Sequence, residues 1–168
     1  LSPLGSFKIV ANLPYYITTP ILNLLLNLKL PIVSISVMVQ KEAAERLVAL
    51  PSTPSYGPLA VLAQYRAEPK IARIIHADQF TPPPKCESAF VVMPFREEPP
   101  VNVVEQTFFK LVNAAFAMRR KTLLNNLMPS FGLSREKAQD LILQAGLSQN
   151  IRGEALSIQQ FARLSNLL

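Results

Sequence analysis

Residues 7–16 read FKIVANLPYY, and this stretch decides the fold of the first part of the chain. The run Phe7–Ala11 is short, apolar and partly β-branched, which is typical of a buried strand. Because Pro14 has no N–H for a sheet ladder, the strand must end within Asn12-Leu13-Pro14-Tyr15. Ligand sites in α/β sheets lie beyond the carboxyl ends of strands, so this motif stands in a position suited to chemistry.

The residues that follow predict helices and strands in alternation. Thr18-Thr19-Pro20 is typical of a helix start. Two late strands are joined by a proline-rich loop without a helix, so we expect them to be antiparallel. The pattern as a whole predicts a doubly wound α/β sheet. The predicted elements are a helix over 20–29, a strand over 32–39, helices over 40–50 and 57–65, and strands over 70–75 and 88–95.

A domain boundary is predicted at Glu97-Glu98-Pro99-Pro100, because helical patterns dominate after it. We therefore expect an α/β domain over residues 1–97 and a small all-helical domain over 98–168. The helices predicted in the second domain cover 103–116, 119–127, a segment from Ser134 to about Gly146, and 157–168.

The composition narrows the classes of protein to which the chain can belong. Its 168 residues are 49% apolar, enough to bury a core, and the formal net charge of +6 favours an anionic partner such as RNA. A single Cys excludes a disulfide framework and a Cys-rich metal site, and a single His argues against a zinc-hydrolase site or a Ser-His-Asp triad. No apolar run is long enough for a membrane span. We therefore expect no metal and no membrane segment.

The residue types of the Asn12–Tyr15 motif suit the exocyclic amine of a nucleobase. The Asn12 oxygen can accept one N–H of the amine, and a backbone carbonyl just before or at Pro14 can accept the other. Two acceptors on one side would aim the nitrogen lone pair, and the Tyr15 ring offers a face on which a base can stack. The alternative is a strand exit with a capping Asn.

Two further motifs could contact a nucleic acid. In Phe80-Thr81-Pro82-Pro83-Pro84-Lys85 the three prolines form a stiff segment, with Phe80 as a second stacking surface and Lys85 near phosphate. The alternative is a proline-rich turn with Phe80 buried. The cations Arg119, Arg120 and Lys121 form a positive cap suited to phosphates, and the alternative is a solvated helix face.

Together these motifs resemble the rRNA adenine N6,N6-dimethyltransferases, which dimethylate two adjacent adenines near the 3′ end of small-subunit rRNA. N-L-P-Y, F-T-P-P-P-K and F-x-x-R-R-K-T stand in the same order in that family. The related macrolide-resistance methylases share the first motif and a Pro-containing loop but lack the R-R-K-T helix. The resemblance extends over nearly the whole chain through Q-K-E at 40–42 with R-L at 46–47, Y-G-x-L at 56–59, and R-x-E-x-L-S at 152–157.

The resemblance implies a fold, a donor and a set of site residues. The fold would be the C-terminal part of a Rossmann-like methyltransferase sheet followed by an all-helical rRNA-binding domain. The methyl donor would be S-adenosylmethionine, which Asn12 would approach. The target adenine would be held by Asn12, Leu13, Pro14 and Tyr15, with Phe80 closing over it, and the RNA-facing residues would be Lys85, Arg119, Arg120 and Lys121.

The resemblance also implies partners and a location. The partners would be small-subunit rRNA and the immature small ribosomal subunit. We expect a monomer in the cytoplasm, with an organellar matrix or stroma as alternatives. The alternative function is a non-catalytic rRNA-binding assembly factor, or an organellar transcription factor of the same superfamily.

One part of the family pattern does not match. In the family, a Gly-rich turn and two acidic strand ends form the donor pocket ahead of N-L-P-Y. Here the five glycines, at positions 5, 57, 132, 146 and 153, form no such turn. We therefore expect the chain as given to be an inactive fragment that carries the target-base half of the site. Outside the motifs, we expect Met38 and Met93 in the core.

Overall fold

The structure is a computed structural model that describes residues 5–168. The chain divides into two compact units, which we describe separately. One contains the residues up to Ala49 together with Leu62–Pro99, and the other contains Leu50–Val61 together with Pro100–Leu168. The segment 50–61 therefore belongs to the unit that contains the C-terminal helices.

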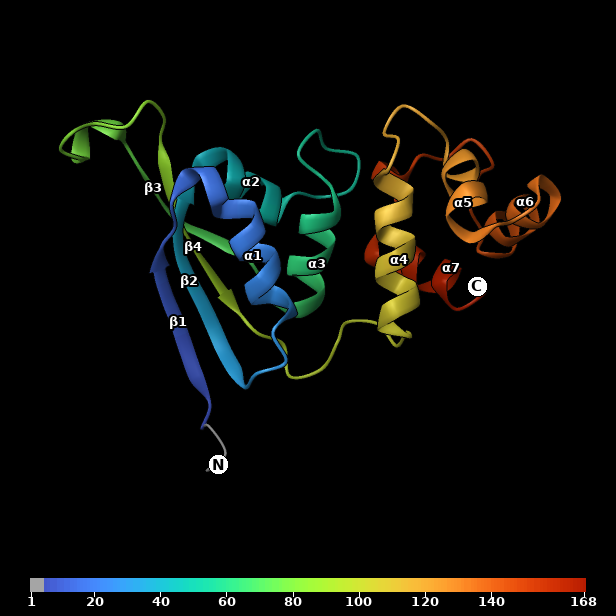
Figure 1. Cartoon of the computed structure of the whole chain (residues 1–168), viewed down its shortest axis with the longest axis horizontal. Coiled ribbons are helices and arrows are strands. Elements are labelled where there is room, and N and C mark those ends of the chain that lie inside the picture. Colours follow the sequence, from blue (N-terminus) through green and yellow to red (C-terminus); the bar gives the residue numbers. More distant parts are fainter. Residues whose placement is uncertain (1–4) are drawn as a thin grey trace. The chain divides into compact units, whose positions relative to one another are not determined.

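A four-stranded sheet forms the first unit, in the order β1-β2-β4-β3 (Figure 1). β1 is parallel to β2, whereas β4 is antiparallel to both β2 and β3, as expected for strands joined without a helix. The strands are β1 (Phe7–Asn12), β2 (Ile32–Gln40), β3 (Lys70–Ile75) and β4 (Ser88–Pro94), and the helices are η1 (Tyr15–Ile17), α1 (Thr18–Asn27), α2 (Lys41–Val48), α3 (Pro58–Arg66) and η2 (Ala77–Gln79).

The two faces of this sheet differ in burial. Ile35, Val37 and Val91 are fully buried and share one face of the sheet, because Val37 pairs with Val91 and Ile35 stands two residues from Val37. Their strand neighbours Met38 and Phe90 on the opposite face are only half-buried. The alternation follows the two-residue period of a strand. Within residues 5–168, α1 and α2 lie on the same side of the sheet (Figure 1).

The two edges of the sheet differ as well. β3 at one edge carries the exposed side chains of Lys70 and Arg73, and its pairing with β4 shifts register at Ala72. β1 at the other edge has the Val10 side chain 74% exposed, and its own register shift lies at its start, between Phe7 and Lys8. Among the described residues, no strand pairs with the outer side of β1.

Helices form the second unit around a core that contains Phe108, Leu127, Ile142 and Phe161, all fully buried. The helices begin at capping residues that the sequence shows: Ser134 accepts from the Lys137 N–H, and Ser157 forms a capping box. The elements are α4 (Glu105–Phe116), α5 (Leu123–Phe131), α6 (Arg135–Gln144), η3 (Gly153–Ala155) and α7 (Ile158–Ser165).

The helix predicted over 119–127 begins only at Leu123. Thr122 has extended backbone, and its hydroxyl accepts the Asn125 N–H, so it caps α5. Residues 117–121 form the turn between α4 and α5. The three adjacent cations therefore lie in a turn and not on a helix.

Gly153 allows the closest backbone approach in the second unit. A Cβ added there would lie 2.8 Å from the carbonyl carbon of Ala115 and 2.9 Å from its Cβ. Both neighbours belong to the backbone or the first side-chain atom of α4, so they cannot rotate away. A glycine at this position lets η3 pack directly on α4.

Candidate target-base site and basic turn

A cavity of about 350 Å³ lies at the carboxyl end of β1. One wall comes from the strand exit and the other from the proline-rich loop between β3 and β4. All five predicted catalytic residues line this cavity, although Phe80 is 65 residues from the consecutive residues Asn12–Tyr15. The lining residues are Asn12, Leu13, Pro14, Tyr15, Met38, Phe80, Pro82 and Pro84.

Backbone hydrogen bonds hold the strand exit in place. The buried Leu13 donates its N–H to the Met38 carbonyl at 3.0 Å. The Pro14 carbonyl accepts two hydrogen bonds, from the Ile17 N–H at 3.2 Å and from the hydroxyl of Thr18 at 3.1 Å. α1 begins at Thr18, two residues before the predicted start, and its N-cap is Ile17, so neither threonine caps the helix.

Two hydrogen-bond acceptors at the cavity remain free. Within residues 5–168, neither the Asn12 side chain nor the Leu13 carbonyl forms a hydrogen bond. The Pro14 carbonyl is occupied by two donors, which matches its two lone pairs. The backbone acceptor available beside Asn12 is therefore the Leu13 carbonyl, the earlier of the two that the sequence left open.

The hydroxyl of the Tyr15 ring bonds to a buried serine that does not line the cavity. The Tyr15 hydroxyl lies 2.5 Å from the hydroxyl oxygen of Ser88, which is fully buried. The next residue, Tyr16, is 86% exposed. Sequence reasoning missed Ser88, since 73 residues separate it from Tyr15.

Two contacts of Glu87 hold the loop that carries Phe80. Glu87 accepts from the Lys41 ammonium at 2.7 Å and lies 2.6 Å from Nδ1 of His76. The hydrogen bond from Lys41 lowers the pKa of Glu87 most, and the hydrogen bond from His76 lowers it further. The Lys41–Glu87 hydrogen bond also raises the pKa of Lys41. His76 and Glu87 stand near the two ends of the loop, so the cluster ties these ends together and to the start of α2.

Met38 differs from its prediction. Met93 is fully buried as expected, whereas Met38 is half-buried and lines the cavity. Its place opposite Asn12 in the β1–β2 register explains the difference, because Asn12 stands where β1 ends. The flexible Met38 thioether gives the cavity an apolar surface that can adjust its shape.

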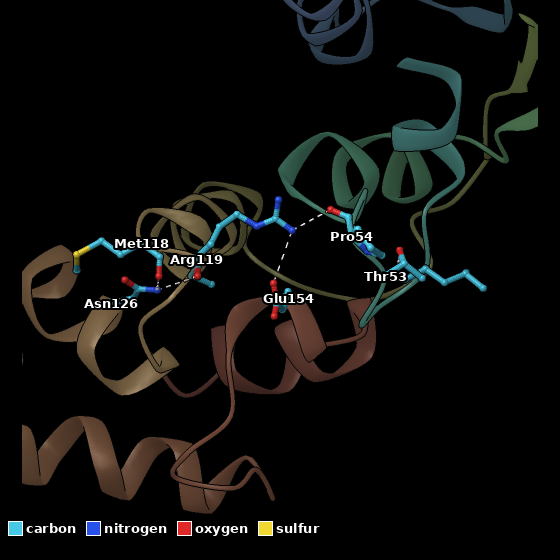
Figure 2. A network of polar contacts seen from close by, with 8 residues as sticks. Thr53, Pro54, Met118, Arg119, Asn126 and Glu154 are labelled. Carbon is cyan, nitrogen blue, oxygen red and sulfur yellow. Dashed lines mark hydrogen bonds and ion pairs between the residues drawn. The ribbon is translucent and has the colours of Figure 1, made fainter. Parts of the chain in front are cut away.

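Arg119 bonds within the helical unit (Figure 2). Its guanidinium donates to the Pro54 carbonyl at 2.9 Å and lies 3.6 Å from a carboxylate oxygen of Glu154. The Glu154 carbonyl in turn accepts the Ser52 N–H at 2.7 Å. Figure 2 also shows the amide of Asn126 pointing at the turn, where it donates to the Met118 carbonyl at 3.3 Å. Arg119 thereby connects the 50–57 segment to η3.

The remaining predicted RNA-facing residues have no such bonds. The side chains of Arg120, Lys121 and Lys85 are exposed and form no hydrogen bond or ion pair within the described part of the chain. Lys85 follows the proline run but does not line the cavity. The predicted set therefore divides into one bonded residue and three free cations.

Comparison with known proteins gives the family. The family model described as ribosomal RNA adenine dimethylase matches residues 2–168. The chain belongs to this family. The resemblance drawn from the motifs is thereby confirmed.

Curated relatives are much longer than this chain. The "Ribosomal RNA small subunit methyltransferase A" of Lactococcus lactis is 48% identical over 163 residues, which cover 96% of this chain and 55% of the relative. The proteins of the same name from Shouchella clausii and Caldanaerobacter subterraneus are 47% and 46% identical, over 97% and 98% of this chain. The chain spans 55–61% of the length of these three relatives.

Two solved structures show the same fold. A dimethyladenosine transferase from Plasmodium falciparum matches with a TM-score of 0.79 at 20% identity, covering 94% of this chain and 64% of that one. The 23S rRNA methyltransferase ErmE matches with a TM-score of 0.70 at 22% identity, covering 98% and 66%. The expected Rossmann-like methyltransferase sheet, followed by helices, is confirmed.

The described residues contain neither a helix that could cross a membrane nor a cluster of metal-ligating side chains. No helix within residues 5–168 has the length and apolar character to cross a membrane. Nor do these residues contain a group of three or more His, Cys, Asp or Glu side chains that could hold a metal ion.

Proposed function

We propose that this chain forms the target-base part of an enzyme that dimethylates N6 of two adjacent adenines near the 3′ end of small-subunit rRNA. The sheet unit would hold the adenine, and the helical unit would bind rRNA within the immature small ribosomal subunit, in the cytoplasm. The observation that carries the proposal is the pair of free acceptors, the Asn12 side chain and the Leu13 carbonyl, at a cavity that Tyr15 and Phe80 also line.

These acceptors can activate an amine that is a poor nucleophile. The lone pair of adenine N6 is delocalised into the ring, so the free base reacts slowly. When its two N–H groups donate to the Asn12 oxygen and the Leu13 carbonyl, the nitrogen is drawn towards a tetrahedral geometry and its lone pair is aimed. After the first transfer one N–H remains, so the monomethylated base can still donate to one acceptor.

The cavity needs no general base for this chemistry. The attacking amine is neutral and releases its proton to water after transfer. Among the lining residues, Tyr15 alone has an ionisable side chain, and its hydroxyl is bonded to Ser88. The Tyr15 and Phe80 rings supply flat apolar surfaces, which suit a planar base.

The residues that line the cavity do not provide the groups that a methyl donor needs. S-adenosylmethionine would supply the methyl group, and its amino and ribose groups call for carboxylates and a close glycine backbone. No acidic residue and no glycine line the cavity. We therefore assign only the base side to residues 5–168, with Asn12 as the group nearest the transferred methyl, and derive no step at the donor.

Substitution of Asn12 tests the proposal. We use the full-length enzyme, meaning this chain together with the donor-binding part that the proposal requires. Asn12→Ala should lower the rate of methyl transfer to immature small subunits by a factor of about 100 or more, because an orienting acceptor is lost. The affinity for rRNA should stay within a few-fold, since phosphate contacts dominate it. Radiolabelled methyl incorporation and filter binding measure the two quantities.

The control is Asn23→Ala, which removes the same side chain from an exposed position on α1. It should leave both quantities unchanged. Near-normal dimethylation by Asn12→Ala would contradict the role of Asn12. Binding of rRNA without any transfer by the unmodified enzyme would favour the alternative, a non-catalytic assembly factor.

A further inference from the structure

The hydroxyls of Tyr15 and Ser88 form the one hydrogen bond of the Tyr15 side chain within the described residues. Their oxygens lie 2.5 Å apart, and either hydroxyl can be the donor. Ser88 is fully buried, so its hydroxyl has no water to replace this partner. A buried hydroxyl without a partner is costly, which makes the bond persistent.

Ser88 is a rigid anchor for this bond. It is the first residue of β4 and pairs with Gln40 of β2 on one side and with Ile75 of β3 on the other. Tyr15, in contrast, begins the short helix η1, outside the sheet. A group on a central strand holds its position more precisely than a group on a turn. The hydrogen bond to Ser88 therefore restricts the movement of the Tyr15 ring.

The neighbouring Tyr16, which has no hydrogen bond to the sheet, differs from Tyr15 in the exposure of its ring. Tyr16 follows directly in the same helix η1, yet its side chain is 86% exposed and has no hydrogen bond within residues 5–168. Tyr15 is half-buried and lines the cavity with Asn12 and Leu13. Position in η1 alone therefore does not direct a ring to the cavity.

We propose that Ser88 is a positioning residue for the target base: its hydroxyl fixes the Tyr15 ring against the cavity, so that a base stacked there presents its amine to Asn12 and Leu13. This inference rests on the proposed function. Ser88 itself does not line the cavity. Its loss should therefore lower the rate of transfer through Tyr15 and leave the affinity for rRNA nearly unchanged.

The first test uses the 168-residue chain alone, labelled with 3-fluorotyrosine. The chain has four tyrosines, at positions 15, 16, 56 and 65, so fluorine NMR should show four resolvable signals. In Ser88→Ala the Tyr15 signal should move and narrow, because the ring turns more freely. The signals of Tyr56 and Tyr65, both buried, should stay in place. The control is Ser36→Ala, at a half-buried serine on β2.

The second test is a double-mutant cycle in the full-length enzyme. Ser88→Ala and Tyr15→Phe should each lower kcat by about threefold to tenfold, the factor that one hydrogen bond of ordinary net strength represents, with KM for rRNA within about twofold. If Ser88 acts through the Tyr15 hydroxyl, adding Ser88→Ala to Tyr15→Phe should cause no further loss. Tyr16→Phe should leave kcat unchanged.

Each outcome decides the inference separately from the proposed function. An unchanged Tyr15 signal in Ser88→Ala, or an equal loss of kcat from Ser88→Ala in both backgrounds, overturns the role of Ser88 while Asn12→Ala still abolishes transfer. If Asn12→Ala retains transfer, the proposed function fails whatever the cycle shows. Should Ser88→Ala not fold, Tyr15→Phe removes the same bond from outside the core, and it must then still reduce kcat and shift no other tyrosine signal.

Discussion

The strand exit at Asn12–Tyr15 and the basic turn at Arg119–Lys121 are alike in one respect. In each, some residues form hydrogen bonds within their unit while adjacent residues keep free polar groups. At the strand exit, Pro14 and Tyr15 form hydrogen bonds within the unit, and the acceptors of Asn12 and Leu13 stay free. In the basic turn, Arg119 bonds to Pro54, while its neighbours stay free. Neighbouring residues of one motif therefore serve either to support the local structure or to bind.

The regions differ in what the support consists of. The strand exit is held by a sheet and by two side-chain hydroxyls, from Thr18 and Ser88. The basic turn is held by the Arg119 guanidinium and by the Asn126 amide, and α4, which precedes it, packs closely on η3 at Gly153. Removing support from the helical unit should therefore cost stability, whereas removing free groups should cost binding alone.

The largest effect on stability should come from Gly153→Ala. The new methyl group would collide with the Ala115 backbone, which cannot yield without moving η3 from α4. We expect the free energy of unfolding of the helical unit to fall by about 2–3 kcal/mol. Urea unfolding followed by circular dichroism measures the change.

Gly57→Ala is the matched control for this substitution. Gly57 belongs to the same unit, and nothing lies within 4 Å of a Cβ built there. It should change the unfolding free energy by no more than a few tenths of a kcal/mol. Equal losses from both variants would show that close packing at Gly153 does not support the basic turn.

The free cations should affect binding and not stability. Replacing Arg120 and Lys121 together by Ala should weaken rRNA binding and reduce the slope of log K against log salt by about 1.4–1.8, at about 0.7–0.9 for each phosphate that is no longer neutralised. The urea midpoint should not move, because neither side chain has a partner within residues 5–168. Filter binding at several KCl concentrations gives the slope. A slope equal to that of the unmodified protein would make these cations a solvated surface.

Arg119→Ala should show the opposite behaviour. Loss of the bond to Pro54 should lower the free energy of unfolding by about 1 kcal/mol, because the side chain is half-exposed and the ion pair with Glu154 is screened. The salt slope for rRNA should change less than in Arg120→Ala. A smaller effect on unfolding than that of Arg120→Ala would end the distinction between the two arginines.

One further effect appears only in alkali. Burial raises the pKa of Tyr56 to about 12, and its hydroxyl donates to the Leu156 carbonyl at 2.8 Å. Because the pKa in the unfolded chain is about 10, the stability from this group is complete below pH 10 and is lost as pH rises towards 12. The stability difference between the unmodified chain and Tyr56→Phe should therefore be constant from pH 7 to 10 and shrink above it. A constant difference up to pH 12 would contradict this.

Local patterns explain what the sequence predicted well. Pro14 marks the end of β1, and Ser134 and Ser157 mark the starts of α6 and α7, because each residue acts on its own backbone neighbourhood. The Asn12 motif and Phe80 could be placed together only because the family resemblance linked them. Their common cavity depends on strand order, which a single sequence does not encode locally.

The sequence does not show which residue of a local motif has a partner elsewhere. α1 begins at Thr18, two residues before the predicted start, and the Thr18 hydroxyl bonds the Pro14 carbonyl. The run Arg119–Lys121 reads as one charged surface, yet Arg119 alone bonds to the Pro54 carbonyl, 65 residues away in the sequence. Ser88 has no local signal at all, because only the folded sheet brings it to Tyr15.

The unpaired outer side of β1 has a consequence for how the chain behaves at high concentration. It presents backbone donors and acceptors beside the exposed Val10, and its register shift and exposed Lys8 lie at its first two residues, whereas β3 at the other edge carries Lys70, Arg73 and a register shift within the strand. Charged and irregular edges resist strand addition, and regular apolar ones invite it. Aggregation of concentrated solutions should thus be directional, beginning from β1, and Val10→Lys should extend the range of concentrations at which the chain stays dispersed.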